Sequence, residues 1–186
     1  MMRISQGQLG GNFTAFLSEG GVLVPGSVRH GHNVLTYTGK RWLSRLVAWE
    51  ALDGSPDGDV AFDDKVRLRW IGVGTGSGLE LPSVNTIQAP VLISGPQYIV
   101  PFDDIASPLQ WIVPTALLIK HVFAATDLPN GVVVTEAGLF VDRNDGGLHL
   151  NPTDSDNAPV FYKAIDPPLP AKSSAQTLTI LWEFRH

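Results

Sequence analysis

The C-terminal stretch Thr177–Phe184, TLTILWEF, carries apolar side chains at every second position. One face of this stretch collects four apolar residues, Leu178, Ile180, Trp182 and Phe184. The opposite face collects Thr177, Thr179 and Glu183. Because side chains of a β-strand alternate between two faces, a period of two indicates a strand with one face buried in a core.

The same period recurs along the chain. It appears in Lys65–Val73, KVRLRWIGV, and in Thr115–Ala125, which is apolar on both sides apart from Lys120 and His121. Shorter candidate strands cover residues 91–100, 132–135, 138–141 and 160–164, with Gly- and Pro-rich turn clusters between many of them. Many short strands separated by Gly- and Pro-rich turns predict a mainly β protein with a β-sandwich or jelly-roll-like domain.

One segment has helical spacing instead. In Gly39–Leu52, GKRWLSRLVAWEAL, the residues Trp42, Leu46 and Trp49 recur three or four positions apart. This spacing predicts a single amphipathic helix near residues 40–52.

Length and composition limit the possible functions. With 186 residues the chain predicts one β-sandwich domain, residues 26–186, preceded by an N-terminal arm, residues 1–25. It has no cysteine, which excludes thiol chemistry and Cys-ligated zinc sites. The net charge is −5 without a basic run, which argues against nucleic acid as a partner. The most apolar stretch is interrupted by Pro114, Lys120 and His121, so we expect no membrane partner.

The N-terminal arm is a candidate interface. Its segment Gly10–Glu19, GGNFTAFLSE, places Phe13, Phe16 and Leu17 between two glycine pairs, which would act as flexible hinges. Exposed aromatic residues on such a tether are typical of interface anchors. The alternative is that the arm adds a strand to its own domain.

The stretch Trp70–Val84, WIGVGTGSGLELPSV, carries glycine at positions 72, 74, 76 and 78. A dinucleotide loop needs G-x-G-x-x-G before a helix, but the sixth position is Ser77 when counted from Gly72 and Leu79 when counted from Gly74. No lysine follows to make a P-loop. We therefore expect a strand that ends in a flexible turn, where glycine supplies positive φ.

Two further features could carry chemistry. His30 and His32 flank Gly31, and an H-x-H pair on a strand points both imidazoles to one side, as in β-barrel metal sites. The cupin pattern wants a glutamate three or four residues later, where Leu35 and Thr36 stand. We therefore expect an exposed turn, with no metal and no cofactor, and keep a cupin-like metal-binding enzyme as a distant alternative.

Glu136 lies inside an apolar run, VVVTEAGLFV, where an ionised carboxylate must find a partner or stay at an edge. We expect it at an edge, or in a salt bridge to an arginine such as Arg69. A catalytic role for this glutamate is the lesser alternative.

Four segments taken together resemble a known family. GVGTGSGLELPSVNTIQAPV from Gly72, VVVTEAGLFVD from Val132, PVFYKAIDPP from Pro159 and the closing TLTILWEF are similar to the N-terminal attachment domain of phage tail-collar and tail-fibre proteins. The resemblance covers roughly residues 65–186. It rests on a glycine turn followed by Pro82 and Thr86, on Glu136-Ala137-Gly138-Leu139-Phe140, and on Tyr162-Lys163 before Pro167.

This resemblance implies a non-enzymatic bacteriophage structural protein, located in the virion at the neck, tail or baseplate as an attachment or adaptor component. It implies other virion proteins as partners and assembly as a homo-oligomer. A capsid decoration protein is the close alternative. It implies no catalytic, cofactor or metal residues, so Phe13, Phe16 and Leu17 remain the candidate interface.

Overall fold

The structure is a computed structural model that describes residues 11–40, 43, 68–93, 97–101, 110–113, 116–141 and 158–185. In this part of the chain the regular elements are mostly short strands. Their bounds are β1 Asn12–Glu19, β2 Val22–Leu23, β3 Arg29–His32, β4 Val34–Leu35, β5 Leu68–Gly74, β6 Ile99–Pro101, β7 Gln110–Val113, β8 Ala116–Phe123, β9 Glu136–Val141, β10 Phe161–Ala164 and β11 Gln176–Arg185.

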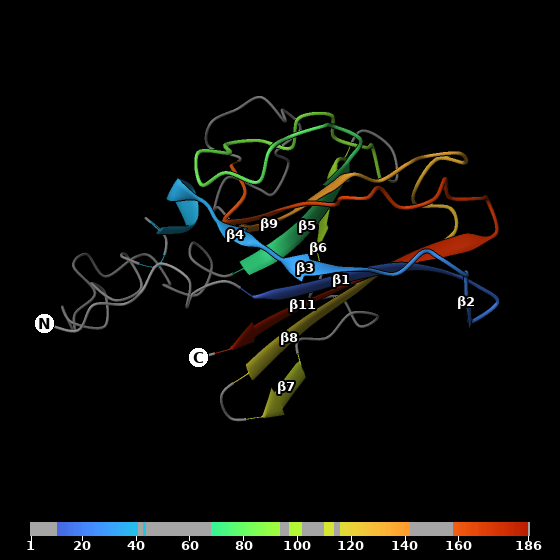
Figure 1. Ribbon diagram of the computed structural model, residues 1–186, viewed down its shortest axis with the longest axis horizontal. Coiled ribbons are helices and arrows are strands. Elements are labelled where there is room, and N and C mark those ends of the chain that lie inside the picture. The colour runs from blue at the N-terminus through green and yellow to red at the C-terminus, as the bar shows by residue number, and fades with distance from the viewer. Residues whose placement is uncertain are drawn as a thin grey trace, which may run out of the picture.

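The strands form two antiparallel sheets that pack face to face (Figure 1). Sheet A has the order β2-β1-β11-β8-β7, with β3 also paired to β1. Sheet B has the order β4-β10-β9-β5-β6. The prediction of a mainly β, β-sandwich fold is confirmed.

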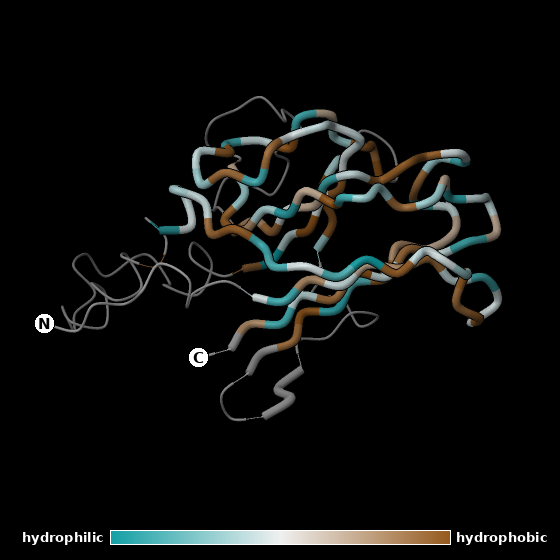
Figure 2. The backbone as a smooth tube through the Cα atoms, viewed as in Figure 1, coloured by the Kyte–Doolittle hydropathy of each residue, from teal (hydrophilic) through white to brown (hydrophobic). Residues whose placement is uncertain are grey.

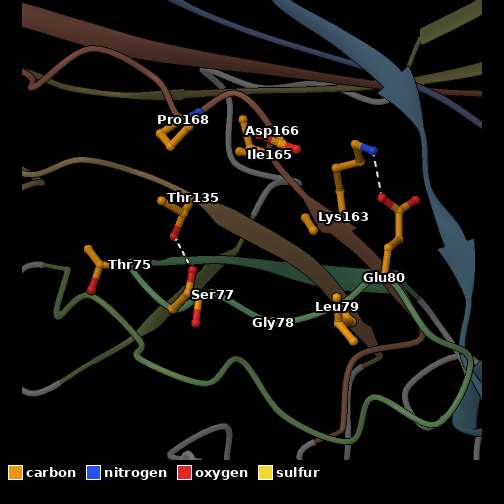
Figure 3. Close-up of a pocket in the computed structure, with 12 residues that line it drawn as sticks. Thr75, Ser77, Gly78, Leu79, Glu80, Thr135, Lys163, Ile165, Asp166 and Pro168 are labelled. Carbon is orange, nitrogen blue, oxygen red and sulfur yellow. Dashed lines mark hydrogen bonds and ion pairs between the residues drawn. The ribbon is translucent and has the colours of Figure 1, made fainter.

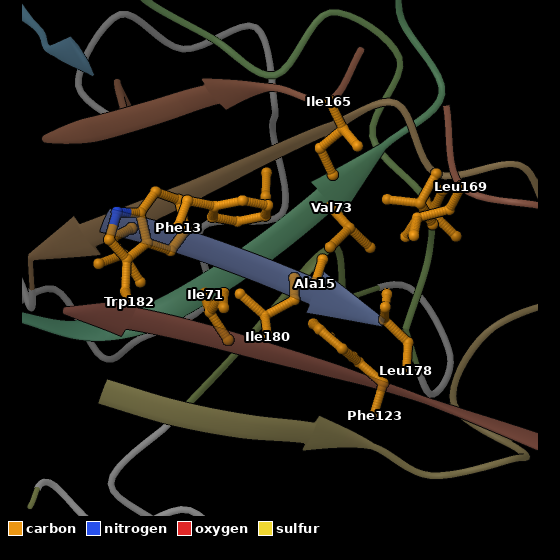
Figure 4. Packing of buried hydrophobic residues seen from close by; sticks show 14 of the residues in the cluster. Phe13, Ala15, Ile71, Val73, Phe123, Ile165, Leu169, Leu178, Ile180 and Trp182 are labelled. Carbon is orange, nitrogen blue, oxygen red and sulfur yellow. The ribbon is translucent and has the colours of Figure 1, made fainter. Parts of the chain in front are cut away.

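The core lies between the sheets and follows the period of two. Apolar and polar residues alternate along β1 and β11 (Figure 2). The alternate residues Phe13, Ala15 and Leu17 of β1 are buried, as are Leu178, Ile180 and Trp182 of β11. They meet Ile71 and Val73 of β5 in sheet B, and Ile165, which directly follows β10 (Figure 4). Phe13 packs edge-on against Trp182, with ring centroids 5.0 Å apart.

Residues 11–25 of the predicted N-terminal arm contain β1 and β2 of sheet A, so this part follows the alternative, in which the arm adds a strand to its own domain. Residues 1–10 lie outside the described residues. Every residue of β1 pairs with β11, from Asn12 opposite Glu183 to Glu19 opposite Gln176. Phe13 and Leu17 are each 1% exposed and belong to the core, while Phe16 is half-buried on the outer face of sheet A. The three candidate interface residues are therefore not presented together to a partner.

The glycine pair after β1 explains this correction. Gly20 and Gly21 have φ of 56° and 82°, and they connect Glu19 to Val22, which pair across the hairpin. A two-residue hairpin turn with positive φ at both positions favours glycine, because side chains with a Cβ are strained there. These glycines therefore form a tight turn between β1 and β2 instead of a hinge.

Beyond sheet B, the chain after β5 forms a covering layer. Ile87 and Tyr98 from this segment pack with Ile99 of β6 and Phe140 of β9, and Trp70 lies against them. We call residues 75–93 the covering loop. Of the predicted strand over residues 91–100, residues 99 and 100 belong to β6, residues 91–93 and 97–98 are not in a strand, and the rest lies outside the described residues.

Residues 132–135, predicted as a strand, lie in neither sheet and run beside the segment around Lys172. Its Val132 accepts a hydrogen bond from the backbone of Lys172, whose carbonyl accepts one from Gly131. The Lys172 side chain is buried, and its Nζ donates to the carbonyls of Ala125 at 2.8 Å and Ser173 at 3.1 Å. Burial lowers the pKa of Lys172, against the opposing charge of Asp127. These contacts join the segment around Lys172 to the segment that runs from Ala125 to Val132.

Residues 37–40 and 43 are helical, and Thr36 begins this helix. The Oγ1 of Thr36 accepts a hydrogen bond from the amide of Gly39 at 3.0 Å, as an N-cap residue does. The rest of the predicted helix 40–52 lies outside the described residues. In the described ranges, no helix is long and apolar enough to cross a membrane.

Candidate functional site

Glu136 begins β9 and is completely buried, with 0% of its surface exposed. On β9, Ala137 and Leu139 belong to the core between the sheets, so Glu136, Gly138 and Phe140 face outward from sheet B. The covering loop lies on this outer face. A carboxylate is thereby placed between sheet B and the covering loop, away from water.

Four donors satisfy this carboxylate. Its Oε1 accepts hydrogen bonds from the amides of Gly76 at 2.9 Å and Ala89 at 3.0 Å. Its Oε2 accepts one from the amide of Gln88 at 3.2 Å and one from the hydroxyl of Tyr162 at 2.8 Å. Glu136 therefore connects two parts of the covering loop to β9 and β10. We call these five residues the Glu136 cluster.

The glycine run packs around this cluster. A Cβ built on Gly74 or Gly76 would collide with the Oε1 of Glu136, and a Cβ on Gly78 would collide with the hydroxyl of Tyr162. The period of two places these glycines on one face of an extended chain, which is the face that approaches the cluster. Glycine is required here because the backbone comes close to buried side chains.

Two predictions are corrected by this geometry. Gly72, Gly74, Gly76 and Gly78 are not in the positive-φ region, so they do not form the expected flexible turn. Glu136 has neither an edge position nor Arg69 as its partner, since backbone amides and Tyr162 bind its two oxygens. Each of the three amides donates a charge-assisted hydrogen bond, which is stronger than a hydrogen bond between neutral groups.

Tyr162 is a member of the cluster that the sequence did not single out for this role. Its side chain is fully buried, and burial raises its pKa, with further contributions from the hydrogen bond to Glu136 and from the charges of Glu136 and Glu80. Because the folded state holds this proton more tightly than the unfolded chain does, the associated stability is fully present below about pH 10, the usual pKa of tyrosine. That stability is lost as the pH rises above about 10.

We therefore expect the free energy of unfolding to fall above about pH 10, with a contribution from Tyr162 of up to about 1.4 kcal/mol per pH unit. In Tyr162→Phe this contribution disappears, so its curve against pH should be shallower. Urea unfolding of both proteins between pH 8 and 11 measures the difference. Tyr37→Phe, which removes an exposed hydroxyl, is the control and should keep the wild-type slope. Parallel curves for wild type and Tyr162→Phe would contradict the prediction.

A groove lies beside the cluster (Figure 3). It has a volume of about 530 Å³ and is lined mainly by residues 75–80 of the covering loop and by residues 163–168. Lys163 and Glu80 form an ion pair of 2.6 Å in its wall, and the hydroxyl of Thr135 donates to the carbonyl of Gly76. These polar groups bind one another, so the groove wall strengthens the link between the covering loop and β10.

The histidine pair lies elsewhere, on the strand β3 instead of on the predicted turn. His30 and His32 are exposed on the outer face of sheet A, opposite Thr14 and Asn12 of β1. The Nδ1 of His30 and the hydroxyl of Thr14 share a hydrogen bond of 2.9 Å. Across the residues that the structure describes, no group of three or more His, Asp or Glu side chains is arranged to hold a metal ion.

Gly31, between these histidines, faces the other way. A Cβ at this position would collide with the side chain of Lys163 on β10. Arg29 points the same way and donates to the carbonyls of Pro167 and Pro168. Side-chain contacts of β3 therefore close the sandwich edge between sheets A and B.

Comparison of the chain with protein-family models, with curated proteins and with solved structures finds no match.

Proposed function

We propose that the protein is a non-enzymatic structural component of a bacteriophage particle, placed at the neck, tail or baseplate as an attachment or adaptor component. The observation that carries this proposal is the convergence of separate motifs. The glycine run, Glu136 and Tyr162 come from three of the segments that resemble phage attachment domains, and they meet in the Glu136 cluster. Buried polar groups that satisfy one another fix a unique structure, which suits a part that must assemble accurately.

The chemistry of the cluster supports a structural role. Its carboxylate is fully buried and accepts four hydrogen bonds from the protein itself. A general base needs contact with the proton that it removes from a substrate. Glu136 instead has its acceptor positions occupied by the covering loop and Tyr162.

The surface supports contacts with other virion proteins and with further copies of the chain. Val22 is 71% exposed at the β1–β2 hairpin, and Leu79 is 71% exposed on the covering loop. Tyr37 and Leu81 are also exposed. The amide of Tyr37 donates to the carbonyl of Pro82, which places Tyr37 close to Leu81, the residue before Pro82. Apolar side chains gathered on a surface are typical of protein interfaces. We propose a symmetric homo-oligomer in the virion.

Analysis of particles tests the proposal. Phage particles purified from cells in which this gene is expressed should contain the chain at a fixed copy number by mass spectrometry. Gold-labelled antibody should bind at the neck, tail or baseplate, and a nonsense mutation should give particles with a defective tail. The amount of an abundant soluble cell protein in the same particle preparation measures how much unbound protein is carried over. Antibody label over the capsid shell would favour the decoration role instead. If the chain were absent from the particles and the nonsense mutant were as infectious as the wild type, both roles would be overturned.

A further inference from the structure

The spacing of His30 and His32 on a strand allows their two imidazoles to act as a bidentate metal chelate. The two residues are separated by one position on β3, so their side chains leave the same face of the strand with Cβ atoms about 6.6 Å apart. Zinc binds imidazole nitrogen at about 2.0–2.1 Å. An ion midway between two such side chains can therefore be reached by one nitrogen of each ring.

The strand holds this pair in place. Asn12 and Thr14 of β1 lie directly opposite His32 and His30 in the ladder, so the backbone of the pair is fixed by sheet A. The hydrogen bond between Nδ1 of His30 and Thr14 orients that ring and leaves Nε2 for a ligand. Metal-binding histidines commonly have their second ring nitrogen held in this way. A chelate on a rigid strand also loses less conformational entropy on binding than one on a mobile turn.

Access and charge are compatible with a cation. Both histidines are exposed, and among the strands that the structure describes β3 pairs with β1 alone. Lys163, which lies on the opposite face of β3 beside Gly31, is neutralised by Glu80 at 2.6 Å. On the outer face, the carboxylate of Glu183 lies beyond Asn12, to which it is hydrogen-bonded.

From the sequence alone we expect no metal at this pair, because the sequence places the pair on an exposed turn. Since the structure places the pair on the strand β3, we revise that expectation and propose that His30 and His32 form a surface binding site for a divalent ion of the zinc class, with water in the remaining coordination positions. Imidazole ligands select zinc, copper and nickel over magnesium and calcium, which prefer oxygen ligands. The site is independent of the proposed virion role. It is also distinct from a cupin centre, because it uses two imidazoles on an exposed strand and no glutamate.

Titration calorimetry with zinc chloride, on folded protein first dialysed against a chelator, tests this site. We expect one zinc ion per chain, with affinity reduced at least about tenfold in His30→Ala and in His32→Ala, and binding abolished in the double variant. Thr14→Val should weaken binding to a smaller extent, since it acts only through the orientation of His30. Magnesium should give no binding heat.

His149→Ala is the matched control, because it removes a histidine from a different part of the sequence. It should bind zinc as the wild type does. Circular dichroism of each variant confirms that the fold is retained, which is expected because both histidines are exposed. Absence of zinc binding to the wild type, or binding that survives the double variant or depends on His149, would overturn the proposal.

Discussion

Deletion of residues 1–20 is expected to abolish folding. The deletion removes β1, which pairs along its whole length with β11 and carries Phe13, Ala15 and Leu17 into the core. Core truncations cost about 3–5 kcal/mol for phenylalanine and about 2–5 kcal/mol for leucine. Together these two side chains alone account for a cost comparable to the 5–15 kcal/mol stability of a typical domain. The truncated protein should be insoluble or lack a cooperative thermal transition by circular dichroism.

Two point variants on the same strand provide the control. Phe13→Ala should lower the free energy of unfolding by about 3–5 kcal/mol, because it leaves a cavity beside Trp182. Phe16→Ala removes the same side chain from the outer face and should cost less than half as much. If Phe13→Ala and Phe16→Ala lowered the free energy of unfolding by equally small amounts, the result would instead support an arm that is separate from the domain. A truncated protein that still melts cooperatively would support the same conclusion.

The sandwich could be predicted from the sequence because its signal is local. In Thr177–Phe184 the predicted burial of a side chain depends on its parity along one strand, and the observed burial of Leu178, Ile180 and Trp182 follows that parity. Thr179 is the exception, because it is buried on the opposite face. The position of β1 could not be predicted in the same way. Its partner β11 lies some 160 residues away, and the same glycine pair fits a hinge or a two-residue turn. The alternation of Phe13, Ala15 and Leu17 was the available signal for a strand.

The partners of Glu136 in the Glu136 cluster could not be predicted from the sequence either. The sequence showed that a carboxylate in an apolar run needs a partner, but the donors come from residues 47, 48 and 60 positions before it and 26 after it. Such contacts exist only once the covering loop has folded onto sheet B. The period of two in the glycine run was a usable signal, because glycines on one face of an extended segment indicate close packing instead of a turn.

Replacement of Glu136 by glutamine is expected to lower the free energy of unfolding by about 2–5 kcal/mol. Glutamine keeps the volume and one acceptor oxygen, but its amide nitrogen must face either the amides of Gly76 and Ala89 or the amide of Gln88. At least one buried donor then loses its acceptor, at about 1–3 kcal/mol, and hydrogen bonds to charge are weakened, each worth about 1.5–3 kcal/mol. Chemical denaturation measures the loss.

Hydrogen exchange locates the effect of this change within the fold. In Glu136→Gln the amides of Gly76, Gln88 and Ala89 should exchange faster through local opening of the covering loop. The amides of β1 and β11 in sheet A should exchange faster only as far as the loss of global stability requires. Glu80→Gln is the control: its ion pair with Lys163 is partly exposed, and its loss should cost no more than about 1 kcal/mol. If Glu136→Gln were as stable as the wild type and its three amides stayed protected, the carboxylate would not be what holds the covering loop on sheet B.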